Sequence, residues 1–172
     1  MPWPSKITRA FTTAERAGHD PFLKNPYYGP YNKLLSTLFP LDSDFIVSFN
    51  FLPGDVDGGE DLFISFEVTL YSTLSFPGPA DRQIHHRLMD MSGDAILPVL
   101  YGISAIGTKL CFYEHETAQR CMSPQHILND PDLITNVMPK EQWDCDVLEA
   151  DGEQRLRALV GQIMEACEHL QT

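Results

Sequence analysis

The run DLFISFEVTLY at residues 61–71 constrains the fold most, because every second residue from Leu62 to Leu70 is aliphatic or aromatic. This period of two is the repeat of a β-strand that turns one face toward a core. The run DFIVSFNF at 44–51 alternates in the same way, and the turn-forming stretch LPGDVDGG separates the two. The sequence therefore predicts two neighbouring strands joined by an acidic loop.

Apolar residues spaced three or four apart predict helices elsewhere in the chain. One covers residues 31–39 and ends at Pro40, a second covers 80–91, and the last begins with Asp151 as N-cap and continues to Leu170. Two further strands are expected within 95–116. This order of helices and strands indicates a mixed α/β or α+β domain built on one sheet.

Length and composition favour one domain. With 172 residues and 43% hydrophobic content, the chain is long enough to bury one core. Residues 1–30 are rich in Pro, Gly, Asn and aromatics, which predicts an extended N-terminal arm with a short helix around residues 12–17. Residues 31–172 are predicted to form the single globular domain.

The charge balance disfavours nucleic-acid binding. Twelve basic residues against 24 acidic ones give a formal net charge of -12, so the average surface repels phosphate. A nuclease with a small basic groove and a bound divalent metal stays open, because the metal supplies positive charge.

No secretory signal or membrane-length apolar run is visible in the sequence, and the four cysteines form no C-x-x-C pair. Reduced thiols and an absence of membrane contact are therefore expected. These features predict a cytoplasmic or nuclear protein.

The tripeptide Glu67-Val68-Thr69 resembles the E-x-K element of metal nucleases, with threonine in place of lysine. Residues two apart on a strand point the same way, so the carboxylate of E-x-K holds Mg²⁺ while the lysine orients water beside the phosphate. Thr69 has no charge and cannot replace that lysine. A solvated Glu67 on a half-exposed strand is the competing interpretation. The candidate metal ligands are Asp55, Asp57, Asp61 and Glu67.

Other metal patterns are weak. The acidic loop GDVDGGED fails the EF-hand spacing, which favours a soluble turn. Adjacent His85 and His86 point about 100° apart on a helix, so they do not form a joint ligand pair and at least one should be exposed. Zinc-capable residue types also follow one another at Cys111, His115, Cys121 and His126, but the gaps are too short for a zinc finger.

Three stretches together resemble an uncharacterised family of mushroom-forming (basidiomycete) fungal proteins with a restriction-endonuclease-like fold of the PD-(D/E)xK type. They are YYGPYNKLLSTLFPLDSDF, ADRQIHHR, and LPVLYGISAIGTKLCFYEHE with the later QWDCDVLEADGEQRLRALV. The similarity spans most of residues 27–170, and GISAIGTKLCFYE followed by W-D-x-D-x-L-x-x-x-G is its most specific part. The resemblance implies divergent relatives of metal-dependent nucleases.

That family carries an aspartate on one strand, E-I-K or E-V-K on the next, and an A-D-x-Q-x-x-x-R helix. The helix matches at Ala80, Asp81, Gln83 and Arg87. Two alignments of the preceding part compete. In one, Glu67 begins an E-x-K strand that has lost its lysine. In the other, Asp61 takes the family's aspartate position and the E-x-K strand is deleted, because STLSFPG is too short to hold another strand.

The resulting expectation is a reduced restriction-endonuclease-like sandwich, with a mixed sheet of about four strands flanked by helices. Its function is expected to be that of a catalytically degenerate binding or self-associating module, with no cofactor and with homodimerisation through an exposed sheet edge. The alternative is a Mg²⁺-dependent nuclease or phosphodiesterase. Its candidate catalytic residues are Asp61, Glu67, Gln83 and Arg87.

Overall fold

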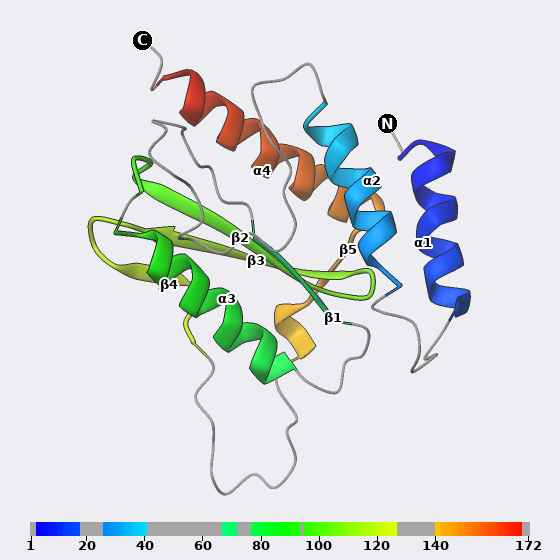
Figure 1. Cartoon of the computed structure of the whole chain (residues 1–172), viewed down its shortest axis with the longest axis horizontal. Helices are drawn as coiled ribbons and strands as arrows, with labels where there is room; N and C mark the ends of the chain where they lie inside the picture. Colours follow the sequence, from blue (N-terminus) through cyan, green and yellow to red (C-terminus); the bar gives the residue numbers. More distant parts are fainter. Residues whose placement is uncertain are drawn as a thin grey trace, which may run out of the picture.

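Figure 1 shows the computed structural model of the chain, which has helices on both sides of one sheet. Over residues 67–71 and 77–80 and at Lys140, the backbone alone is described. The described residues are 3–17, 26–40, 67–71, 77–93, 95–126 and 140–169.

Helices and strands are mixed along the described parts of the chain. The helices are α1 (Ser5–Ala17), α2 (Tyr28–Leu38), α3 (Pro77–Met91), the single 3₁₀ turn η1 (Lys140–Gln142) and α4 (Ala150–Glu168). The strands are β1 (Glu67–Tyr71), β2 (Val99–Ile106), β3 (Lys109–Glu116), β4 (Cys121–Ser123) and β5 (Cys145–Asp146).

The sheet is mixed. Strand β1 runs parallel to β2, with α3 as the connection between them, and β2 pairs antiparallel with β3. The turn between β2 and β3 contains Gly107 at φ +63°, a backbone conformation that glycine adopts without steric cost. Strands β4 and β5 each pair antiparallel with β3. The expected mixed α/β class is confirmed at this level.

Helices cover both faces of the sheet and create two separate apolar clusters. Alternate residues of β2 and β3, such as Ile103 and Leu110, pack against α1, α2 and α4 on one face. The intervening residues, such as Cys111 and Tyr113, pack against α3 on the other face. The period of two along the strands therefore divides the molecule into three layers (Figure 1).

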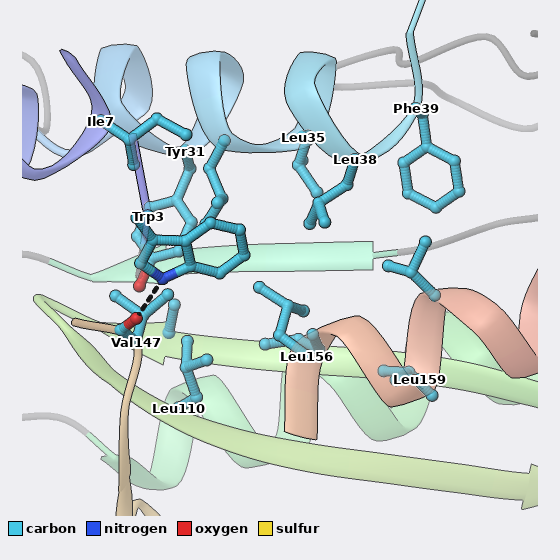
Figure 2. Close-up of a cluster of buried hydrophobic side chains, with 14 of the residues drawn as sticks. Trp3, Ile7, Tyr31, Leu35, Leu38, Phe39, Leu110, Val147, Leu156 and Leu159 are labelled. Atoms are coloured by element: carbon cyan, nitrogen blue, oxygen red, sulfur yellow. Dashed lines mark hydrogen bonds between the residues drawn. The ribbon is translucent and has the colours of Figure 1, made fainter. Parts of the chain in front are cut away.

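The expectation of an extended arm over residues 1–30 is corrected at residues 5–17, where the helix expected around 12–17 is present but longer. Residues 5–17 form α1, whose Ile7 and Phe11 are buried in the larger cluster. Ahead of the helix, Trp3 donates a hydrogen bond from Nε1 to the Val147 carbonyl oxygen at 2.6 Å (Figure 2). The guanidinium of Arg157 stacks 4.3 Å from the Trp3 ring centroid. Apolar burial together with these contacts holds the segment on the domain.

The W-D-x-D-x-L-x-x-x-G motif has a structural role around Asp146. One carboxylate oxygen accepts hydrogen bonds from the Thr108 hydroxyl at 2.8 Å and lies 3.3 Å from the Lys109 ammonium. The other oxygen accepts the Leu148 backbone N–H at 2.9 Å. The final glycine, Gly152, brings the first turn of α4 directly against the backbone of β5.

The helices expected over 31–39, 80–91 and the C-terminal region are present, with shifted ends. Glu149, and not Asp151, is the N-cap of α4. The strand expected at 44–51 and the first part of 61–71 lie outside the described residues. Among the described residues, no helix combines the length and apolar character needed to span a membrane.

Two glycines of α4 provide a matched stability test. A Cβ added at Gly152 would overlap the carbonyl group of Asp146, whereas one added at Gly161 would meet nothing within 4 Å. We expect Gly152→Ala to lower the free energy of unfolding by about 1–3 kcal/mol or more, as overpacking does. Gly161→Ala should raise it by up to about 1 kcal/mol through helix propensity. Urea unfolding of both variants measures this difference, and equal effects would contradict the close packing of α4 on β5.

Candidate functional site

Helix α3 lies close to the sheet because β2 has a glycine beneath it. A Cβ at Gly102 would lie only 2.9 Å from Cδ1 of Ile84 and 3.1 Å from Cδ1 of Leu88, so a larger residue would crowd these two side chains. The buried side of the helix consists of Asp81, Ile84, His85 and Leu88, spaced as one helical stripe. Two of these four side chains are polar, and buried polar groups are costly unless they are partnered.

Asp81 is fully buried and is held from two directions. The hydroxyl of Tyr113 on β3 donates a hydrogen bond to Oδ1 at 3.1 Å. Nδ1 of His126, from the segment after β4, lies 2.7 Å from Oδ2. Burial, followed by the neighbouring Cys111 and Asp81, raises the pKa of Tyr113, so its hydroxyl stays protonated and acts as a donor. The carboxylate therefore sits in a defined orientation.

His85, one helical turn after Asp81, is only 8% exposed. Its Nε2 lies 3.9 Å from Oδ1 of Asp81, which is too long for a hydrogen bond. Neither ring nitrogen has a hydrogen-bond partner among the described residues. Burial lowers the pKa of His85, with Asp81 opposing that shift and the other nearby histidines adding to it. The ring is thus a buried, neutral imidazole.

Aromatic contacts fix the position of the His85 ring. It packs edge-to-face on Tyr113, with centroids 5.5 Å apart and an interplanar angle of 86°. The ring of His126 lies 5.1 Å away, tilted by 52°. One potential ligand atom from each of Asp81, His85 and His126 lies within 4.8 Å of the other two. These three residues are called the Asp–His cluster below, and their residue types are common ligands of transition metals.

A further buried histidine lies under the same helix layer. His115 on β3 is 1% exposed, and neither of its ring nitrogens has a hydrogen-bond partner among the described residues. Burial, with a smaller contribution from Arg120, lowers its pKa. His115 is therefore held in the neutral form, adjacent to the Asp–His cluster but not a member of it.

The residues predicted from the sequence are not all described. Asp55, Asp57 and Asp61 lie outside the described residues. Glu67 begins β1, with its Cα opposite Gly102 of β2. On α3, Gln83 is exposed and Arg87 is partly buried, and both lie off the stripe that carries Asp81 and His85. Asp81, from the same A-D-x-Q-x-x-x-R pattern, belongs to the Asp–His cluster.

Local signals for the cluster were present in the sequence. Asp81 and His85 stand four residues apart, the spacing that places two side chains on the same helical face. His86 is exposed, as expected for at least one of the adjacent pair. Of the zinc-capable set at Cys111, His115, Cys121 and His126, only His126 joins the cluster. No sequence spacing links it to α3, because β2, β3 and β4 intervene.

Comparisons with family models, with curated proteins and with solved structures found no match to this chain.

The buried His115 predicts acid sensitivity of the fold. Its lowered pKa means that the unfolded chain takes up a proton at that site before the folded one does. The stabilising effect is therefore complete above the unfolded pKa of about 6.5 and is lost as pH falls toward the folded pKa. Unfolding free energies between pH 7.5 and 5 should fall less steeply in His115→Leu than in the wild type. Replacement of the exposed His86 by alanine is the control, and an unchanged slope in His115→Leu would refute the assignment.

Proposed function

We propose that this protein is a catalytically degenerate, restriction-endonuclease-like domain that acts as a binding module and does not cleave phosphodiesters. The resemblance of its sequence to that fold family is consistent with a mixed sheet and a helix that connects parallel strands. The proposal depends on what lies beside the E-x-K position. In a working nuclease of this type, a cation beside the metal offsets charge on the phosphate.

The sheet register places only neutral residues opposite the position where that cation would be. Thr69, at the lysine position of E-x-K, is opposite Ser104 on β2, and Ser104 is opposite Cys111 on β3. Ser104 and Cys111 are both buried, and burial raises the pKa of Cys111 to about 12, so its thiol is neutral. This row of the sheet therefore contributes no positive charge across three strands.

The row of facing residues that begins at Glu67 also contains no positively charged residue. Glu67 is opposite Gly102, and Gly102 is opposite Tyr113. Arg87 on α3 is partly buried, but it lies off the helical stripe that packs on these strands. With a formal charge of -12, the whole chain offers little attraction to a phosphate backbone. These features favour retained architecture over retained catalysis.

Self-association is the binding mode that the sequence suggests. In the described strand order, β1 is terminal, which is consistent with pairing between chains at that side of the sheet. Sedimentation velocity over a hundredfold range of protein concentration tests this mode. A concentration-dependent dimer would support it, and a monomer throughout would argue for a different partner.

A cleavage assay separates the proposal from the Mg²⁺-dependent alternative. Purified protein, incubated with supercoiled plasmid and with single-stranded RNA in Mg²⁺ or Mn²⁺, should show no cleavage above the buffer background. Glu67→Ala should be indistinguishable from the wild type. Glu114→Ala, which removes an exposed carboxylate from β3, is the matched control. Metal-dependent cleavage that survives in Glu114→Ala and disappears in Glu67→Ala would overturn the proposal and establish the phosphodiesterase.

A further inference from the structure

We infer that Asp81, His85 and His126 form a binding site for one transition-metal ion of the zinc class. The three side chains come from α3 and from the segment after β4, and their ligand atoms converge within 4.8 Å. The inference concerns this site alone and holds whether or not the sheet carries nuclease activity.

The donor set selects the class of metal. Mg²⁺ and Ca²⁺ prefer six or more oxygen ligands, whereas two imidazoles and one carboxylate suit Zn²⁺ and related first-row ions. Sites with three protein ligands leave the fourth tetrahedral position for water or another small ligand. The chemistry of the Asp–His cluster therefore differs from that of the acidic residues 55–61, for which Mg²⁺ would be the natural ion.

The distances show how far the three side chains must move to bind an ion. Zn²⁺ bonds of roughly 2.0–2.2 Å in a tetrahedral arrangement place neighbouring donor atoms about 3.4 Å apart. In the structure, His126 Nδ1 lies 2.7 Å from Asp81 Oδ2, and His85 Nε2 lies 3.9 Å from Asp81 Oδ1. These two separations involve different oxygens of the carboxylate, and each must change by less than about 1 Å to reach that tetrahedral spacing. No separation among the three ligand atoms exceeds 4.8 Å, so the widest must close by at most about 1.4 Å to reach the same spacing.

His85 gives an independent reason to expect a ligand. An imidazole that is nine-tenths buried, with no hydrogen-bond partner among the described residues, is costly to keep in an apolar layer. The carboxylate of Asp81 is near enough to attract it but too far to accept its proton. A metal ion between these groups would provide the partner that a ring nitrogen of His85 otherwise lacks among the described residues.

Tyr113 would support the metal from behind the carboxylate. Its hydroxyl donates to Asp81 Oδ1, and its ring packs edge-to-face against His85, so one residue orients two of the three ligands. Such supporting contacts fix ligand geometry, and their removal typically weakens metal binding by about 10- to 100-fold. Tyr113 is accordingly a positioning residue and not a ligand.

The site has one open side. The side chain of His126 is 43% exposed, whereas those of His85 and Asp81 are 10% and 0% exposed. An ion could therefore enter past His126, and the fourth coordination position would lie on that solvent-facing side. Binding would also fasten the segment after β4 to α3, because these elements supply the ligands together.

Titration of the metal-free full-length chain with ZnCl₂ tests the inference. Protein treated with EDTA, dialysed and kept reduced should bind one Zn²⁺ per chain in calorimetry, and Co²⁺ should give the visible absorption of a tetrahedral site. His126→Ala should bind at least about tenfold more weakly, and Tyr113→Phe about 10- to 100-fold more weakly. His86→Ala and Cys121→Ser are matched controls, an exposed neighbouring histidine and an exposed thiol, and both should bind like the wild type.

The outcomes are decisive in both directions. No binding, or equal binding by His126→Ala and His86→Ala, would overturn the inference and leave Asp81 and His126 as a metal-free ion pair. Loss of binding in Cys121→Ser would likewise overturn it by assigning the metal to thiols. Circular dichroism checks that His126→Ala folds; if it does not, His126→Gln and a Zn²⁺-dependent rise in the melting temperature of the wild type replace the comparison. Failure of this test would not affect the cleavage assay, since the two use different residues.

Discussion

The arrangement of the layers depends on contacts made by the short segment from β5 to the start of α4. Within two residues, Asp146 accepts a hydrogen bond from the Thr108 hydroxyl, the Val147 N–H donates to the Thr108 carbonyl at 2.9 Å, and the Val147 carbonyl accepts one from the Trp3 indole. The β2–β3 turn, the N-terminal segment and α4 therefore meet at one stretch of backbone. Leaving such buried groups without a hydrogen bond costs free energy, so loss of these bonds would destabilise all three elements together.

On the opposite face of the sheet, the buried layer contains polar as well as apolar side chains. There α3 packs closely because Gly102 has no side chain, and the helix brings polar as well as apolar residues into the buried layer. Asp81 is compensated by Tyr113 and His126, whereas His85 and His115 are buried without hydrogen bonds among the described residues. Stability alone would favour apolar side chains at such positions. Of these two histidines, only His85 belongs to the Asp–His cluster, where the inferred metal ion would supply its missing partner.

Much of the fold was predictable from local pattern. Apolar spacing placed α2, α3 and α4, and alternation placed the β2–β3 hairpin, because each pattern reflects the geometry of the element itself. The helix α1 was predicted only in part, since two of the four residues before it are prolines while its stabilisation comes from distant contacts. Trp3 depends on Val147 and Arg157, far along the chain, and neither contact leaves a local signal.

The candidate site was likewise predictable from the sequence only in part. The A-D-x-Q-x-x-x-R pattern and the four-residue spacing of Asp81 and His85 can be read from the sequence, because one helix determines which residues share a face. Which face turns inward, and that His126 returns from beyond β4 to meet it, depends on strand pairing and on the packing of α3 over Gly102. These are contacts between residues distant in the chain, and their energies come from burial and hydrogen bonding that no local spacing encodes. The sequence alone therefore determines the residue types, whereas the tertiary structure determines that these residues lie close together.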